Sequence, residues 1–216
     1  WLSESSGETL IEGLRQLPGK YTEWLSGEAA RVSTIGDEDL EKQAKSHIEQ
    51  AEAVRDRMNE AIDMIADAED RDVEKAFRLA NRAIRMQRQW GNPGEKALVW
   101  RPFQLGFILL SLSSLADENH SDRHTADLLW FPTGGGKTEA YLGLVAFLFF
   151  LRRLRYGAKG AGVSAIMRYT LRLLTTQQFQ RAAALVCACE VIRQGEGRPP
   201  GIDEDFPGAP FSLGLW

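Results

Sequence analysis

The chain has 216 residues, of which 44% are hydrophobic and 26% charged, with a formal net charge of −4. This balance is typical of a globular protein and allows one large or two small domains with a core. No uncharged apolar run reaches the roughly 18 residues of a membrane-spanning helix, so we expect no membrane association and a cytoplasmic location. The chain begins at Trp1 with polar residues, and we expect it to be a piece of a larger polypeptide.

Charge is divided unevenly along the chain. Residues 1–75 carry 9 Lys and Arg against 19 Asp and Glu, a net charge of −10, whereas residues 76–216 carry 17 against 11, a net charge of +6. We interpret the acidic part as the solvated faces of helices. The basic part suits a surface that binds phosphate groups, but so small an excess does not by itself establish one.

The N-terminal region, residues 1–95, is predicted to be helical. Residues 1–36 mix short helical patterns with the breakers Pro18, Gly19, Gly27 and Gly36. A helix is predicted to begin at Asp37, because acidic residues favour a helix start, and its buried stripe recurs in steps of three and four: Ala44, Ile48, Ala51, Met58, Ile62 and Ile65. A further helix is predicted from Val73 to Trp90. We interpret this region as a helical packing module.

Residues 91–94 are predicted to be a linker, and residues 96–216 to form a second domain. It opens with Arg101-Pro-Phe-Gln104, which runs into an apolar helix over residues 105–115. The side-chain amide of Gln104 both donates and accepts hydrogen bonds, so it can pair with the N6 and N7 edge of adenine. The alternative is a helix N-terminus with an early proline and no ligand.

The most specific motif is Phe131-Pro-Thr-Gly-Gly-Gly-Lys-Thr138, which follows a short apolar run, residues 127–130, and precedes an apolar helix, residues 139–154. Three glycines allow backbone N–H groups to surround a phosphate, and the helix N-terminus favours the same anion. We predict that ATP binds here, that Lys137 contacts its phosphates and that the Thr138 hydroxyl ligates Mg²⁺. One feature is unusual, because Phe131 stands where the motif usually has its first glycine. The rest of the predicted loop is Thr133, Gly134, Gly135 and Gly136.

Beyond this helix, residues 163–169 read as a second buried strand, followed by a helix over residues 179–192. A strand, a crossover helix and a second strand predict a parallel sheet, and so an α/β domain. Residues after the second strand would lie on the ligand side of the sheet, and Thr175 and Thr176 could cap the next helix. The candidates for nucleic-acid backbone contacts are Arg168, Thr170, Arg172, Thr176 and Gln177.

No zinc site or disulfide is expected. Cys187 and Cys189 are two positions apart on a predicted helix, so they face different ways, and we interpret both as buried apolar residues. His120 and His124 lie in a polar segment without a third ligand, which favours a solvated loop. His47 is interpreted as an ordinary helix residue.

Taken together, Arg101-Pro-Phe-Gln104, Pro132-Thr-Gly-Gly-Gly-Lys-Thr138 and Leu174-Thr-Thr-Gln177 resemble motifs Q, I and Ia of a superfamily 2 helicase motor. Longer strings around residues 76–87, 128–142 and 167–179 resemble the DrmA family, the helicases of the bacterial anti-phage defence system DISARM. The resemblance implies a partial RecA-like P-loop domain with a parallel sheet, preceded by the all-α region. It also implies ATP with Mg²⁺, DNA as substrate, a DrmB-like partner subunit, and a nucleotide contact by Arg101 beside that of Gln104.

A motor also needs an acidic pair that ends a buried strand and holds Mg²⁺. Asp203-Glu204 follows a segment rich in Gly and Pro that is not expected to form such a strand, so we reject it. We therefore expect hydrolysis to depend on residues outside this chain. The alternatives are a nucleotide-gated DNA-binding or assembly subunit without hydrolysis, a phosphate-loop kinase or an AAA-type ATPase, and RNA in place of DNA.

Overall fold

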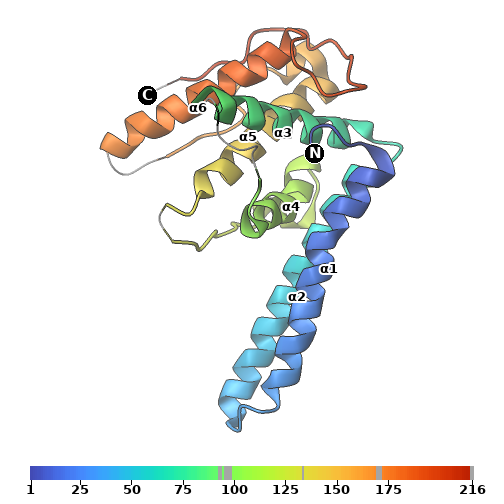
Figure 1. Cartoon of the computed structure of the whole chain (residues 1–216), viewed down its shortest axis with the longest axis vertical. Coiled ribbons are helices and arrows are strands. Elements are labelled where there is room, and N and C mark those ends of the chain that lie inside the picture. The colour runs from blue at the N-terminus through green and yellow to red at the C-terminus, as the bar shows by residue number, and fades with distance from the viewer. Residues whose placement is uncertain (92–93, 95–98, 133, 169–171, 215–216) are drawn as a thin grey trace.

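The computed structural model describes residues 1–91, 94, 99–132, 134–168 and 172–214, with the backbone alone for residues 172–175. Its order is α1 (Gly7–Val32), α2 (Glu38–Ala66), α3 (Arg71–Gly91), α4 (Pro102–Ala116), η1 (Ser121–His124), α5 (Lys137–Tyr156), η2 (Gly157–Gly160) and α6 (Arg172–Arg193). Helices α1 and α2 form an antiparallel arm that projects from a body made by the other helices (Figure 1).

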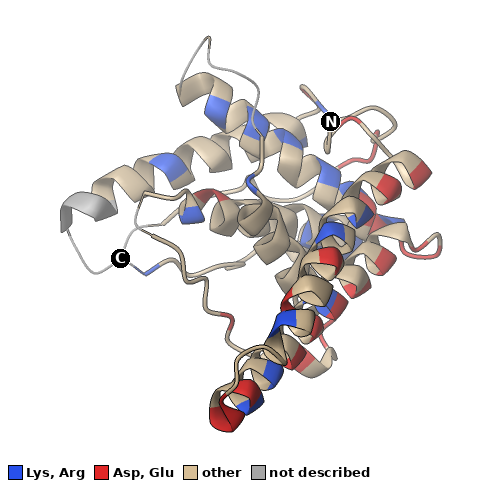
Figure 2. Ribbon diagram, turned by 60° about the horizontal axis from the view of Figure 1, so that its bottom comes forward, with Lys and Arg blue, Asp and Glu red and all other residues tan. Residues whose placement is uncertain are grey.

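The arm follows from capping and from an apolar stripe. The Asp37 carboxylate accepts hydrogen bonds from the N–H groups of Asp39 and Leu40, which confirms the predicted start of α2. Acidic residues of this first turn lie at the free end of the arm, and Figure 2 shows acidic ribbon segments there. The predicted breaks at Pro18, Gly19 and Gly27 were wrong, because α1 continues through all three residues. Pro18 is buried, so its packing offsets the backbone hydrogen bond that a proline cannot make.

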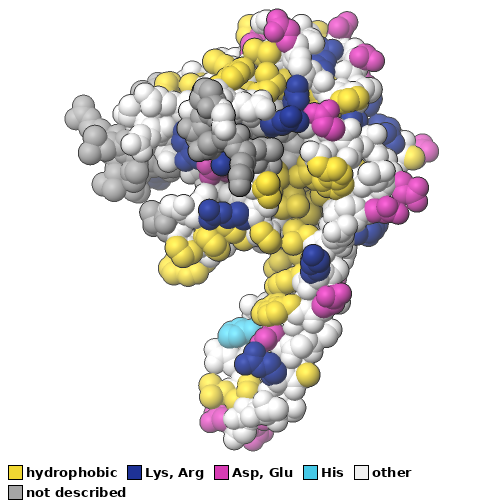
Figure 3. Space-filling view, viewed as in Figure 1, with side chains coloured by type: hydrophobic (Ala, Val, Ile, Leu, Met, Phe, Trp, Pro, Cys, Tyr) yellow, Lys and Arg dark blue, Asp and Glu magenta, His cyan; other side chains and the backbone are white. Residues whose placement is uncertain are grey.

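The core of the body is organised around α3. Its buried side chains include Phe77, Leu79 and Ile84, and the helix packs against α2, α5 and α6. This confirms the predicted helix over residues 73–90 and its buried face. Side chains from α4 and α5 complete the core, and exposed apolar side chains gather mainly on the body (Figure 3).

The predicted α/β fold was wrong for this chain. The structure is 68% helical, and no residue in the described ranges belongs to a strand. The two segments predicted as strands, residues 127–130 and 163–168, are irregular, and residue 169 lies outside the described part. Most of their apolar side chains are exposed, at 83% for Leu128, 90% for Trp130 and 78% for Val163, and only Leu129 and Met167 are partly buried against the core. A buried parallel strand requires hydrogen-bonded neighbours and covered faces, and these segments have neither here.

Helix α6 begins earlier than predicted. It starts at Arg172 rather than at residue 179, so Thr176 lies inside its first turns and does not cap it. Leucine and glutamine in this stretch are good helix formers, which favours continuation of the helix toward Arg172. The predicted helix over residues 105–115 is confirmed as α4, and that over residues 139–154 as α5.

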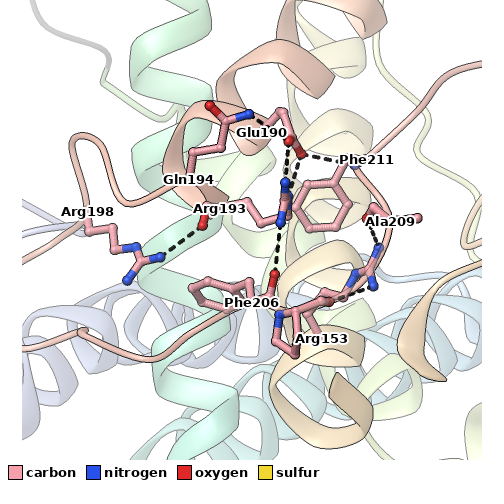
Figure 4. A network of polar contacts seen from close by, with 9 residues as sticks. Arg153, Glu190, Arg193, Gln194, Arg198, Phe206, Ala209 and Phe211 are labelled. Carbon is pink, nitrogen blue, oxygen red and sulfur yellow. Dashed lines mark hydrogen bonds and ion pairs between the residues drawn. The ribbon is translucent and has the colours of Figure 1, made fainter. Parts of the chain in front are cut away.

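A network of arginines holds residues 206–211 against α5 and α6 (Figure 4). Glu190 and Arg193 pair along α6 at 2.7 Å, Arg193 Nη1 donates to the Phe206 carbonyl at 3.0 Å, and Arg153 on α5 donates to the Pro207 carbonyl at 3.1 Å. The Phe211 N–H donates to Glu190 Oε2 at 3.1 Å. The segment is thereby fixed by both its backbone and its aromatic rings, since Phe211 also stacks on Phe149.

This network predicts an acid-dependent loss of stability. Hydrogen bonding to Arg193 lowers the pKa of Glu190 from 4.5 to about 2. The ionised carboxylate therefore stabilises the folded state at pH values above about 4.5, and this stabilisation is lost as the pH falls toward 2. We expect Glu190→Gln to lower the free energy of unfolding at pH 6 by on the order of 2 kcal/mol, with a smaller deficit near pH 3.

Urea unfolding of the chain at pH 6 and pH 3, followed by circular dichroism, measures this difference. The exposed Glu196, mutated as Glu196→Gln, is the matched control on the turn after α6. A deficit of the same size at both pH values would show that Glu190 acts through packing rather than through its charge.

Candidate functional site

The glycine-rich loop between residue 131 and α5 has the backbone shape that its sequence predicts. Gly134 and Gly136 have φ values of +81° and +92°, in a backbone region that residues other than glycine rarely adopt. The Gly135 N–H donates to the Pro132 carbonyl at 3.2 Å, which closes a turn. Thr133 lies outside the described residues. The loop therefore bends tightly and opens into α5 at Lys137.

The first turn of α5 faces this loop without a side-chain cap. Gly136 is the N-cap residue, and no side chain among the described residues hydrogen-bonds to the N–H groups at this end of the helix. These N–H groups and the positive end of the helix dipole are available to an anion at the loop. Lys137 and Thr138 are the first two residues of the helix, and both are partly buried.

Lys137 folds back over the loop. Its ammonium group donates a hydrogen bond to the Phe131 carbonyl, six residues earlier. A positive charge is therefore held across the turn formed by the glycines. This arrangement suits the binding of a phosphate, because a flexible ammonium group can exchange a backbone carbonyl for a phosphate oxygen.

Two residues at the start of α4 hold the loop through its backbone carbonyls. Arg101 Nη1 donates to the Gly135 carbonyl at 3.0 Å, and Gln104 Nε2 donates to the Gly136 carbonyl at 2.7 Å. Gln104 Oε1 in turn accepts from the Arg101 N–H at 2.9 Å. Both ends of the buried Gln104 amide are thus engaged with backbone, so in this structure Gln104 positions the loop. Adenine recognition by Gln104, and nucleotide contact by Arg101, stay predictions.

Phe131 occupies the position of the missing first glycine for a structural reason. Its ring stacks on Phe103 of α4, with ring centroids 3.8 Å apart and an interplanar angle of 13°. A Cβ atom on Gly135 would lie 2.6 Å from Phe131 Cε1 and 3.0 Å from the Pro132 carbonyl oxygen. Gly135 is therefore required because the aromatic stack fills the space beside it. The sequence motif places these residues near one another but does not reveal the stack.

A second set of contacts, missed in the sequence, ties the arm to the segment that leads into the loop. Arg57 of α2 forms two hydrogen bonds with the Asp127 carboxylate, at 2.7 and 2.8 Å, and pairs with Asp122 at 3.0 Å. The side chains of Arg57 and both aspartates are largely buried. These charge-assisted bonds fix the approach to the loop from residues on both sides of residue 95. The predicted domain boundary at that residue stays a prediction.

The residues predicted to contact nucleic acid lie around the start of α6. Arg168, Thr176 and Gln177 have exposed side chains. Arg168 also lines an apolar hollow of about 770 Å³ between α5, α6 and residues 209–214. Thr170 lies outside the described residues, and Arg172 is described by its backbone alone, as the first residue of α6. Their contact with nucleic acid stays a prediction.

The described residues lack a cluster of side chains of the kind that usually binds a metal ion. No group of three or more His, Cys, Asp or Glu side chains in the described part of the chain could hold one. Residues 202–206 form a loop, in which Glu204 pairs with Lys75 of α3. His120 bonds to Glu60 at 2.9 Å and accepts from the Asp122 N–H at 3.0 Å, so it anchors η1. Ligation of Mg²⁺ by Thr138 stays a prediction.

The cysteines partly confirm their predicted roles. Cys187 and Cys189 are both free thiols in this structure. Cys189 is buried in the core, and burial raises the pKa of its thiol. Cys187 is exposed, so its predicted burial was wrong, because it lies on the outer face of α6.

No helix in the described part of the chain is long and apolar enough to cross a membrane.

The chain is similar to a protein of a bacterial defence system. It is 36% identical over 224 residues to the DISARM protein DrmA of Bacillus paralicheniformis. The alignment includes 95% of this chain but only 19% of that protein, so the chain spans about a fifth of its relative's length. This similarity confirms the resemblance predicted from the sequence. No protein-family model matches the chain.

Proposed function

We propose that this chain is the ATP-binding part of a helicase or translocase that acts on DNA in anti-phage defence. The observation that carries the proposal is the glycine loop, in which Gly134 and Gly136 have positive φ and Lys137 spans the turn at an uncapped helix start. Similarity to the DISARM protein DrmA over nearly the whole chain supports the role in defence.

In this proposal each loop residue has a distinct task. The N–H groups of residues 134–136 and the start of α5 bind phosphate oxygens, and Lys137 neutralises their charge. Thr138 would supply a hydroxyl ligand to Mg²⁺, which when bound would offset the negative charge of the phosphates. Arg101 and Gln104 keep the loop in this shape through their bonds to the Gly135 and Gly136 carbonyls.

The proposed DNA contacts are backbone contacts at the start of α6. The exposed side chains of Thr176 and Gln177, near the start of α6, are suited to hydrogen bonds with phosphate oxygens. Arg168 would add a positive charge beside them, and Thr170 and Arg172 belong to the same predicted set. Contacts of this kind carry no base specificity, so we propose binding that does not depend on sequence.

We further propose that the protein works with a DrmB-like partner subunit, as its similarity to a DISARM protein suggests. A second candidate is a nucleotide-gated DNA-binding or assembly subunit that does not hydrolyse ATP. One observation favours it, namely that the described residues contain no acidic cluster suited to a metal ion. The two candidates differ in turnover and not in nucleotide binding.

ATP turnover by the full-length protein separates them. Phosphate release is measured without nucleic acid, then with single-stranded DNA, double-stranded DNA and RNA of equal length. The helicase proposal predicts that DNA increases turnover several-fold over RNA or no polymer. Binding of an ATP analogue without turnover, even after a DrmB-like subunit is added, would support the nucleotide-gated subunit. Absence of both binding and turnover would contradict both candidates.

A further inference from the structure

We infer that an ion pair between Glu139 of α5 and Arg181 of α6 couples the phosphate-binding loop to the nucleic-acid contacts at the start of α6. Arg181 Nη2 donates to Glu139 Oε1 in this pair. The inference rests on the proposed function, and it assigns a positioning role to Arg181 that neither the sequence motifs nor the proposed binding residues include.

On the loop side, Glu139 lies two residues after Lys137 in the first turn of α5. Its Oε2 atom is 3.3 Å from the point that a Cβ on Gly136 would occupy, so the carboxylate adjoins the last glycine of the loop. The same oxygen is buried and has no hydrogen-bond partner. A carboxylate at this point repels phosphate unless its charge is compensated, and Arg181 is the compensating cation.

On the α6 side, Arg181 lies four residues after Gln177 and therefore on the same face of the helix. Its backbone carbonyl accepts a hydrogen bond from Gln87 Nε2 of α3 at 2.6 Å. Arg181 thus stands where three helices meet, one turn from the residues proposed to contact DNA. A shift of the first turns of α6 changes the distance between its guanidinium group and Glu139.

Through these contacts, DNA bound at the start of α6 affects the binding of ATP at the glycine loop. DNA bound at the start of α6 holds the helix against α5 and keeps the ion pair closed. The Glu139 carboxylate then remains compensated, and the phosphates of ATP bind beside it at a lower electrostatic cost. Loss of the pair lets the loop and the DNA contacts act independently, so DNA no longer promotes the use of ATP.

The test compares Arg181→Gln with wild type in the full-length protein, by ATP turnover with and without double-stranded DNA. Without DNA we expect Arg181→Gln to raise the KM for ATP, because Glu139 loses its compensating cation, and to keep kcat at saturating ATP within about twofold of wild type. We expect the DNA-dependent gain in kcat/KM to fall by at least about fivefold, the lower range of measured couplings between sites. Arg181→Lys should retain most of the gain because it keeps the charge. Gln180→Ala, an exposed side chain on the same turn, is the matched control and should leave the gain unchanged.

Two results would overturn the coupling while leaving the proposed function intact. One is a DNA-dependent gain in Arg181→Gln equal to that of wild type. The other is an equal fall in turnover with and without DNA together with a lower Tm, which indicates a structural role alone. Absence of any DNA-dependent turnover in wild type would instead contradict the proposed function, and the coupling with it.

Discussion

Lys137→Ala is expected to reduce ATP turnover by roughly 100-fold or more, because removal of one group that stabilises developing charge in a site costs two to three orders of magnitude. Lys137 is the first residue of α5, and its ammonium group spans the glycine turn to the Phe131 carbonyl. No other lysine lies in the loop. We expect both kcat and the affinity for ATP to decrease, because the Lys137 ammonium group contacts the phosphates in the bound state and in the transition state.

The matched control is Lys159→Ala, which removes an exposed lysine from η2. Turnover of this variant should equal that of wild type. Circular dichroism and Tm must show that Lys137→Ala remains folded, since the charged hydrogen bond to the Phe131 carbonyl that it loses contributes about 1.5–3 kcal/mol. Retained turnover in a folded Lys137→Ala protein would exclude the loop as the site of ATP hydrolysis.

Gly135→Ala is expected to weaken nucleotide binding by roughly tenfold to hundredfold. The added methyl group would lie 2.6 Å from Phe131 Cε1, and Phe131 cannot retreat because its other face stacks on Phe103. Overpacking of this kind costs about 1–3 kcal/mol, and every 1.4 kcal/mol is a tenfold change in affinity. The overpacking distorts the loop itself, because the Gly135 carbonyl also accepts the Arg101 hydrogen bond that holds the loop in place.

Phe131→Ala/Gly135→Ala is the informative second variant. Removal of the ring creates room for the new methyl group, so we expect the double variant to bind an ATP analogue more tightly than Gly135→Ala. Isothermal calorimetry with the analogue measures both affinities. Equal affinities for the two variants would show that the aromatic stack does not dictate the glycine, and would instead implicate the contact with the Pro132 carbonyl.

Local sequence patterns predicted the helices well. Asp37 caps α2, the apolar steps of Phe77, Ala80 and Ile84 are buried in α3, and an apolar run forms α5 directly after the loop. Each of these signals arises from residues within a few turns of one another, so the chain itself contains the determining contacts. The glycine positions of the loop were predictable for the same reason, since positive φ is a local property.

Contacts between distant segments decided the rest. The runs ending at Trp130 and beginning at Val163 have strand-like composition, yet they lie exposed because a strand depends on neighbours that its own sequence does not specify. Four contacts that surround the loop likewise join residues 28 or more positions apart: Gln104 with Gly136, Phe131 with Phe103, Arg57 with Asp127, and Glu139 with Arg181. The sequence therefore determined most of the helices and the tight, positive-φ turn of the glycine loop. Only the tertiary structure decided what clamps that loop, because packing selects one partner among many of similar chemistry.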